Sequence, residues 1–310
     1  FRIAGGPGGR IRVAGNNERG AVYGIGKLLR SGRVESGRFR PGPWRGTSVP
    51  AKPVRGLYLA THFHNFYHDA PLGEVEAYIE ELALWGFNTL MVWYDMHHFK
   101  GFDDPEAVAF RERLARLAGA ARGVGMKFGF TIIANEAYAD SPPELRADPR
   151  AKRGGYYDVA VCPSRPGGLA YIKRVFSQFF EWASDLRPEY LWIWPFDQGS
   201  CGCPACSPWA CNGFLKCARL EADLARAAWP GVSVVLSTWM FREWEAFRAA
   251  FPEPPAWVDL LLAEPPRAGI VPGAVPVVGF PEISMWGMNP WGGYGATPLP
   301  ERHERLWREA

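Results

Sequence analysis

The sequence predicts an α/β protein: a (β/α)8 barrel of the TIM type, preceded by a small α/β domain. Short apolar segments alternate with helical patterns through most of the 310 residues. This alternation is typical of parallel strands joined by right-handed helical crossovers. No GxGxxG motif begins any of the expected helices, which disfavours a dinucleotide-binding Rossmann sheet. A Gly-, Pro- and Arg-rich segment, residues 31–53, separates the alternating region from the N-terminal part.

The first 50 residues predict a partial α/β domain and a linker. Residues 10–14 alternate as a strand does, residues 15–17 are typical of a turn, and residues 20–29 place small and apolar side chains at helical spacing. The linker ends in Pro-Ala-Lys-Pro. We therefore expect one domain over residues 1–50 and a barrel domain over residues 51–310.

Seven strands and six helices are expected in the barrel domain. The strands are apolar segments at 55–61, 88–94, 127–134, 190–196, 233–239, 258–263 and 276–280. The helical patterns lie at 72–85, 105–123, 168–186, 214–228, 241–250 and 300–309. A closed barrel has eight strands, so either the C-terminal part is truncated or two elements have been merged.

Composition excludes several classes of protein. An apolar content of 47% and a charged content of 22% describe a globular chain. The net charge of +3 comes with no basic run, so nucleic acid is not an expected partner. No apolar stretch is long enough to cross a membrane. The chain begins with Phe1, which leaves both an exported and a cytoplasmic location open, and the oligomeric state is undetermined.

Carboxylates gather at the expected carboxyl ends of the strands, where barrel enzymes place their catalytic groups. Paired carboxylates are typical of glycosidic bond cleavage: one donates a proton to the leaving oxygen while the other attacks or activates water. The expected catalytic residues are Asp197, Glu136, Glu282 and Glu264.

Aromatic and polar residues at the same strand ends are expected to bind a sugar. The chain has 14 Trp, 11 Tyr and 19 Phe, and flat apolar rings suit the face of a sugar. Trp192, Trp194 and Trp209 give the fourth strand and its loop such a surface. The expected substrate-binding residues are His62, His64, Asp95, His97, Gln198, Trp239 and Trp286.

Several segments resemble a known group of enzymes. Ile11–Val13, Arg19–Gly24 and the double leucine at 28–29 resemble the small domain before the barrel in family 20 β-hexosaminidases and in α-glucuronidases. Residues 55–59 and 88–90 resemble the first two barrel strands of the same enzymes. The resemblance covers roughly residues 10–100, and it implies a glycosidase that acts on hexosaminides or uronides.

The end of the fourth strand departs from the family 20 pattern. Those enzymes carry an Asp-Glu pair there, with the Glu as general acid and the Asp orienting the acetamido group. Asp197 matches the Asp, but Gln198 stands at the position of the Glu and cannot donate a proton as an acid. The family's sugar-binding Arg after the first strand has no counterpart. The α-glucuronidase layout, an acid on strand four and bases on later strands, matches Asp197, Glu264 and Glu282.

Four cysteines form a compact cluster after the fourth strand. Cys201, Cys203, Cys206 and Cys211 lie within eleven residues. Four thiols suit a closed tetrahedral zinc site that would brace this loop. One or two disulfides in an exported protein, or inert thiols, are the alternatives. No cofactor is expected for catalysis.

The sequence thus predicts a glycoside hydrolase that uses carboxylate acid/base catalysis on a carbohydrate substrate. One alternative is a metal-dependent barrel hydrolase, because His62 and His64 at the first strand end resemble the metal site of amidohydrolase-type barrels. Those enzymes also need histidines on strands five and six, and this chain has none there. The other alternative is a carbohydrate-binding barrel without catalysis, which Gln198 favours.

Overall fold

The computed structural model describes most of the chain and groups it into two compact units. The described residues are 1–61, 66–148, 159–195, 200–238, 244–253, 255–263, 275–280, 301, 304, 305 and 308. The first unit comprises Phe1–Asp95, Asp103–Thr131 and Ala183–Tyr190, and the second comprises Met96–Phe102, Ile132–Trp182 and Leu191–Ala310. The division into domains at residue 50 stays a prediction.

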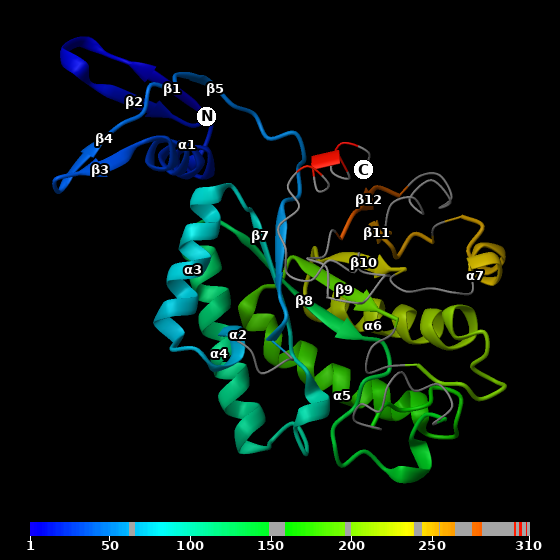
Figure 1. The fold of residues 1–310 in the computed structure, drawn as a ribbon. Helices are drawn as coiled ribbons and strands as arrows, with labels where there is room; N and C mark the ends of the chain where they lie inside the picture. The colour runs from blue at the N-terminus through cyan, green and yellow to red at the C-terminus, as the bar shows by residue number, and fades with distance from the viewer. Residues whose placement is uncertain are drawn as a thin grey trace. The chain divides into compact units, whose positions relative to one another are not determined.

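A seven-stranded sheet forms the framework of the fold (Figure 1). Its strands are β6 (Gly56–Leu59), β7 (Thr89–Trp93), β8 (Lys127–Ile133), β9 (Tyr190–Trp194), β10 (Ser233–Ser237), β11 (Leu260–Leu262) and β12 (Val277–Val278). They lie in chain order across the sheet, and the β6–β7, β7–β8, β10–β11 and β11–β12 pairs are parallel. All seven strands expected from the sequence are present, with shorter bounds. Parallel strands in chain order are the arrangement of a (β/α)8 barrel.

Helices connect the strands. They are α2 (Phe66–Asp69), α3 (Leu72–Trp85), α4 (Pro105–Gly123), α5 (Gly168–Ala183), α6 (Leu215–Ala228) and α7 (Trp244–Ala250). The N-terminal end of α4 is fixed by Asp104, whose side chain accepts a hydrogen bond from the backbone N–H of Glu106. Gly86 ends α3 with a φ of 102°, a conformation that favours glycine. Among the described residues, no helix has the length and apolarity needed to cross a membrane.

The central strands of the sheet are buried because both of their faces are covered. All five residues of β7 and all five of β9 are buried, as expected for parallel strands covered on both faces. In the first unit α3 and α4 pack side by side (Figure 1). Leu114, Leu117 and Ala118 of α4 are fully buried.

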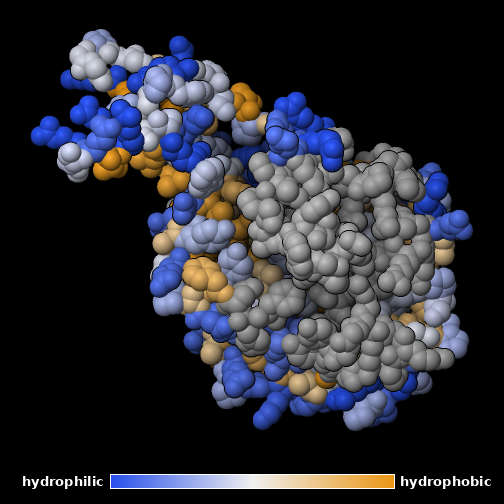
Figure 2. All heavy atoms as spheres, viewed as in Figure 1, coloured by the Kyte–Doolittle hydropathy of each residue, from blue (hydrophilic) through white to orange (hydrophobic). Residues whose placement is uncertain are grey.

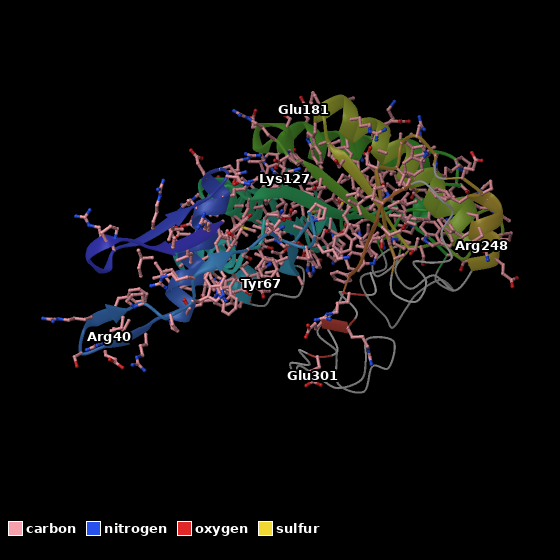
Figure 3. All side chains as sticks on the ribbon, turned by 90° about the horizontal axis from the view of Figure 1, so that it is seen from above. Arg40, Tyr67, Lys127, Glu181, Arg248 and Glu301 are labelled. Atoms are coloured by element: carbon pink, nitrogen blue, oxygen red, sulfur yellow. The ribbon has the colours of Figure 1, made fainter. Side chains whose placement is uncertain are left out.

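The N-terminal region holds a second, antiparallel sheet of β1 (Arg2–Gly5), β2 (Ile11–Ala14) and β5 (Gly46–Thr47), together with α1 (Glu18–Ser31). A hairpin of β3 (Arg33–Glu35) and β4 (Arg38–Arg40) follows α1. The expectation of an aperiodic linker over residues 31–53 is therefore wrong for the hairpin and for β5. Strands of two or three residues are too short to produce a detectable alternation. Figure 3 labels Arg40 on this hairpin, whose side chains project outward.

Residues 1–50 bury little apolar surface of their own. All of them are described, and Ile3, Gly24 and Gly26 are the only ones that are buried. Figure 2 shows apolar side chains, in orange, on the part of the surface where α1 and the hairpin lie. The exposed apolar residues of this region are Ile25, Leu29, Val34, Phe39 and Val49. Because so small a core contributes little free energy, we expect this region to depend on its contact with α3.

That contact is made by the C-terminal halves of two helices of the first unit. A Cβ at Gly26 of α1 would overlap the carbonyl group of Leu84 in α3. The guanidinium of Arg30 donates a hydrogen bond to the same carbonyl oxygen and lies 4.4 Å from the ring centroid of Trp85. Burial lowers the pKa of Arg30. Glycine at position 26 thus lets α1 approach the backbone of α3.

We therefore predict that Gly26→Ala destabilises the protein. The added methyl group forces the two helices apart, at a cost of about 1–3 kcal/mol in the free energy of unfolding. The control is Gly119→Ala on α4, where an added Cβ meets nothing within 4 Å. This substitution should raise the free energy of unfolding by up to about 1 kcal/mol, because alanine favours a helix more than glycine does. Urea unfolding of both variants measures the effects. Equal stabilisation by the two substitutions would contradict the close approach of α1 and α3.

Candidate active site

The segment after β8 carries a buried carboxylate. Strand pairing continues one residue beyond β8, where the backbone N–H of Ala134 donates to the carbonyl of Trp194. A turn then follows, closed by a hydrogen bond from the N–H of Glu136 to the carbonyl of Ile133. The Glu136 side chain is 1% exposed. The sequence predicted a catalytic role for this residue, and the structure places it at the carboxyl end of the third strand.

Glu136 pairs with a histidine from the turn that follows β7. His97 lies in a 3-10 turn, Met96–His98, and its Nδ1 is hydrogen-bonded to Oε1 of Glu136. The backbone N–H of His97 also donates to this oxygen, at 3.4 Å. The ring of His98 lies 4.3 Å from that of His97, centroid to centroid. Because Glu136 engages Nδ1, the orientation of the His97 ring is fixed.

Asn135 joins two loops through its side-chain amide. Its Nδ2 donates to the carbonyl oxygens of Val161, at 2.9 Å, and of Ser200, at 3.1 Å. Its Oδ1 accepts from the backbone N–H of Ser200, at 2.7 Å. Asn135 is fully buried, so these bonds are shielded from water and hold the two backbones beside Glu136.

Ser200 occupies an unusual backbone conformation at this junction. Its φ is 92°, in a region that non-glycine residues rarely adopt and that costs of order 1–3 kcal/mol. Two hydrogen bonds with the Asn135 side chain stabilise this conformation, one donated by Nδ2 and one accepted by Oδ1. In the chain, Ser200 directly follows the segment with Asp197 and Gln198.

A four-cysteine cluster lies on the same two loops. It consists of Cys162, Cys201, Cys203 and Cys206, whose sulfur atoms all lie within 4.8 Å of one another. The predicted set named Cys211 in place of Cys162. Cys211 lies outside this group, in the helical turn Ala210–Phe214. Cys162 was missed because it precedes its partners by 39 or more residues, and spacing along the chain does not reveal such a contact.

The thiols of this four-cysteine cluster differ in their environments. Cys162, Cys201 and Cys206 are buried, whereas Cys203 is partly exposed. Burial raises the pKa of Cys201 to about 11 and also raises the pKa of Cys206. The pKa of Cys203 is lowered, because hydrogen bonds from the neighbouring thiols and from the backbone N–H of Cys206 outweigh its slight burial.

A second buried carboxyl group comes from helix α6. Glu221 is fully buried, and within the described part of the chain its carboxyl oxygens have no hydrogen-bond partner. It belongs to the buried stripe of α6 together with Cys217, Ala218, Ala222 and Ala225. Glu221 was not among the predicted site residues, although a charged residue on this apolar helical stripe was a detectable signal.

The three tryptophans of the fourth strand and its loop are almost fully buried. Trp192 and Trp194 are 5% and 4% exposed and stack at 4.8 Å between ring centroids, with Phe280 edge-on to both. Trp209 is 4% exposed, and its Nε1 donates to the carbonyl of Pro195. The prediction that these three rings form a sugar surface is wrong. Trp192 and Trp194 project from the same face of β9, because side chains two apart in a strand share a face.

The remaining predicted residues fall into two groups. Asp95 lies two residues after the end of β7, in the first unit, and is fully buried. The others lie outside the described residues: Asp197, Gln198, Glu264, Glu282, His62, His64, Trp239 and Trp286.

Comparisons with known proteins identify the fold. No protein family model matches the chain, and no curated protein matches it. Among solved structures, a glycoside hydrolase family 20 β-N-acetylglucosaminidase aligns with a TM-score of 0.62 and 15% identity, over 92% of this chain and 64% of that one. A mutant Streptomyces plicatus β-hexosaminidase in complex with its product GlcNAc gives 0.58 and 15%, over 92% and 60%. The family 20 β-N-acetylhexosaminidase from Streptomyces coelicolor gives 0.54 and 14%, over 86% and 57%.

The chain therefore spans about three fifths of the length of these enzymes. Sequence identities near 15% are evidence for a shared fold only, and not for a shared function. The resemblance predicted from the N-terminal motifs is confirmed at that level: the chain has the fold of the family 20 β-hexosaminidases, a TIM-type barrel with an N-terminal domain.

Proposed function

We propose that this chain is a glycoside hydrolase that cleaves a glycosidic bond by carboxylate acid/base catalysis. The observation that carries the proposal is the buried hydrogen bond between His97 and Glu136. Each residue follows a strand of the parallel sheet at its carboxyl end, where barrel enzymes hold their catalytic groups.

The energetics of this pair favour a functional role. Each buried ion costs several kcal/mol of desolvation, and apolar residues of similar volume often stabilise a fold as well or better. Both side chains are 1% exposed. An imidazole and a carboxylate in this buried position therefore give the fold no clear gain in stability, which favours a functional reason for keeping them. In our proposal, Glu136 fixes the orientation of the His97 ring, and the pair orients the sugar or moves a proton.

The other predicted carboxyl groups follow the fourth, sixth and seventh strands along the chain. Asp197 follows β9 in the chain, Glu264 follows β11 and Glu282 follows β12. The amide of Gln198 has no acidic proton. We therefore propose that Asp197 orients the substrate and that Glu264 or Glu282 supplies the acid.

The fold neighbours suggest which substrates to test first. They are described as a β-N-acetylglucosaminidase, a β-N-acetylhexosaminidase and a β-hexosaminidase with GlcNAc bound. We propose β-hexosaminides as the first substrate class and uronides as the second, because the N-terminal motifs resemble both groups of enzymes.

Burial and the neighbouring carboxylate of Glu136 favour the protonated form of Glu221. Burial raises the pKa of Glu221 well above its usual range, and the negative charge of Glu136 raises it further. In our proposal, Glu221 keeps its proton to a higher pH than an exposed glutamate does.

We predict that Glu136→Gln lowers kcat/KM by about 10²–10⁴-fold, the range for loss of a general acid–base group. Glutamine keeps the shape of the side chain but removes the charge that holds the His97 ring. The control is Glu144→Gln, an exposed residue eight positions later, which should leave the activity unchanged. The measurement is hydrolysis of a panel of aryl β-N-acetylhexosaminides and aryl uronides.

Three outcomes would contradict this assignment. Equal activity of Glu136→Gln and Glu144→Gln would remove Glu136 from the site. Glycan binding without turnover on any member of the panel would support the carbohydrate-binding barrel that Gln198 favours. Loss of activity in His62→Asn and His64→Asn, with Glu136→Gln still active, would support the metal-dependent hydrolase.

We also predict that Glu221 makes stability fall as pH rises. In the unfolded chain this carboxyl titrates near 4.5. The folded pKa is higher, so between the two values the native state holds a proton that the unfolded state has lost. Each pH unit in that window lowers the free energy of unfolding by up to about 1.4 kcal/mol. Glu221→Gln abolishes this dependence.

Urea unfolding at pH 5, 6, 7 and 8 tests this prediction. The stability of Glu221→Gln relative to wild type should increase with pH. Asp223→Asn, exposed on the same helix, is the control and should show no such trend. A difference between Glu221→Gln and wild type that does not vary with pH would mean that the native carboxyl is already ionised.

A further inference from the structure

The four-cysteine cluster joins two loops that are far apart in the chain. Cys162 lies six residues before α5, and the other three cysteines follow the end of β9. All four belong to the second unit. Asn135 bonds the backbones of Val161 and Ser200, the residues directly before Cys162 and Cys201. The amide and the thiols thus join the same two segments.

We propose that Cys162, Cys201, Cys203 and Cys206 bind one zinc ion in a closed tetrahedral site. The sulfur of Cys162 lies 3.7 Å from that of Cys203 and 3.7 Å from that of Cys206. Ligands about 2.3 Å from a tetrahedral zinc ion are separated by about 3.8 Å. The sulfur positions therefore match the edges of such a site.

The same distances argue against disulfides. A disulfide needs its sulfur atoms about 2.05 Å apart, and all six cysteines are free in the structure. Four sulfurs that mutually approach within 4.8 Å form a compact group around one centre, not two separate pairs. A set of four thiolates selects zinc or iron over harder cations.

Neighbouring groups are placed to support bound thiolates. The backbone N–H of Asp148 donates to the sulfur of Cys201 at 3.3 Å. The hydroxyl of Ser164 lies 3.2 Å from the sulfur of Cys206 and could donate to it once that thiol has lost its proton to solvent on metal binding. Hydrogen bonds of this kind orient metal ligands.

The role of this zinc is structural. Four protein ligands leave no open position for water or substrate, which separates closed sites from catalytic ones. The zinc fixes the loop after β9 against the segment before α5, beside Asn135 and Glu136. This inference does not rest on the proposed glycosidase activity, and a chain without turnover would still bind the metal.

The test begins with the metal content of the purified full chain and with cobalt substitution. We expect about one zinc per chain by elemental analysis. The cobalt-substituted chain should show thiolate-to-cobalt charge-transfer bands and the intense visible bands of tetrahedral cobalt. Iron in place of zinc would overturn the choice of metal. A chain with no bound metal and fewer than six titratable thiols after denaturation would overturn the site in favour of disulfides.

Variants test which cysteines bind. Cys162→Ser should weaken zinc binding by more than about 100-fold, beyond the range for outer-shell partners. Cys211→Ser, the matched control, should leave the affinity unchanged. The reverse pattern, with Cys211 required and Cys162 dispensable, would contradict the proposed ligand set.

A conservative replacement separates ligation from folding. Cys203 is the least buried of the four, so Cys203→His offers a nitrogen ligand with little disturbance of the core. We expect this variant to keep one cobalt per chain with shifted visible bands and weaker charge transfer, because one sulfur has been replaced. A spectrum identical to that of wild type would mean that Cys203 does not touch the metal.

Discussion

The side-chain amide of Asn135 makes the contact on which the rest of the site depends. Three hydrogen bonds tie it to Val161 and Ser200, so one buried residue aligns the loops that follow β8 and β9. Its position next to Glu136 connects this alignment to the His97–Glu136 pair. Cys162 and Cys201 lie one residue beyond Val161 and Ser200, which explains why cysteines distant in the chain meet.

Buried polar groups are concentrated in this part of the second unit. His97, Glu136, Glu221 and Asn135 are all at most 2% exposed. An apolar interior would be more stable, because each buried ionisable group incurs desolvation. Natural folds keep such groups mainly where chemistry or binding requires them. The α1–α3 contact and the apolar strands β7 and β9 supply stabilisation that offsets this cost.

The sequence predicted the barrel framework well because long periodic segments determine it. Helices α3 and α4 have the bounds expected from their pattern, and all seven strands were found. The β3–β4 hairpin was missed because three-residue strands carry no periodic signal. The predicted stacking surface of Trp192 and Trp194 failed because the pattern of β9 does not say which side chains reach a ligand. Cys162 was missed because its partners are brought to it only by the fold.

The most direct test of the account is a crystal structure of the wild-type protein with N-acetylglucosamine. The account predicts a sugar within hydrogen-bonding distance of His97 or Glu136, next to the junction that Asn135 holds. A sugar bound elsewhere on the barrel, with the His97–Glu136 pair still enclosed by protein, would contradict the assignment of this pair to the active site.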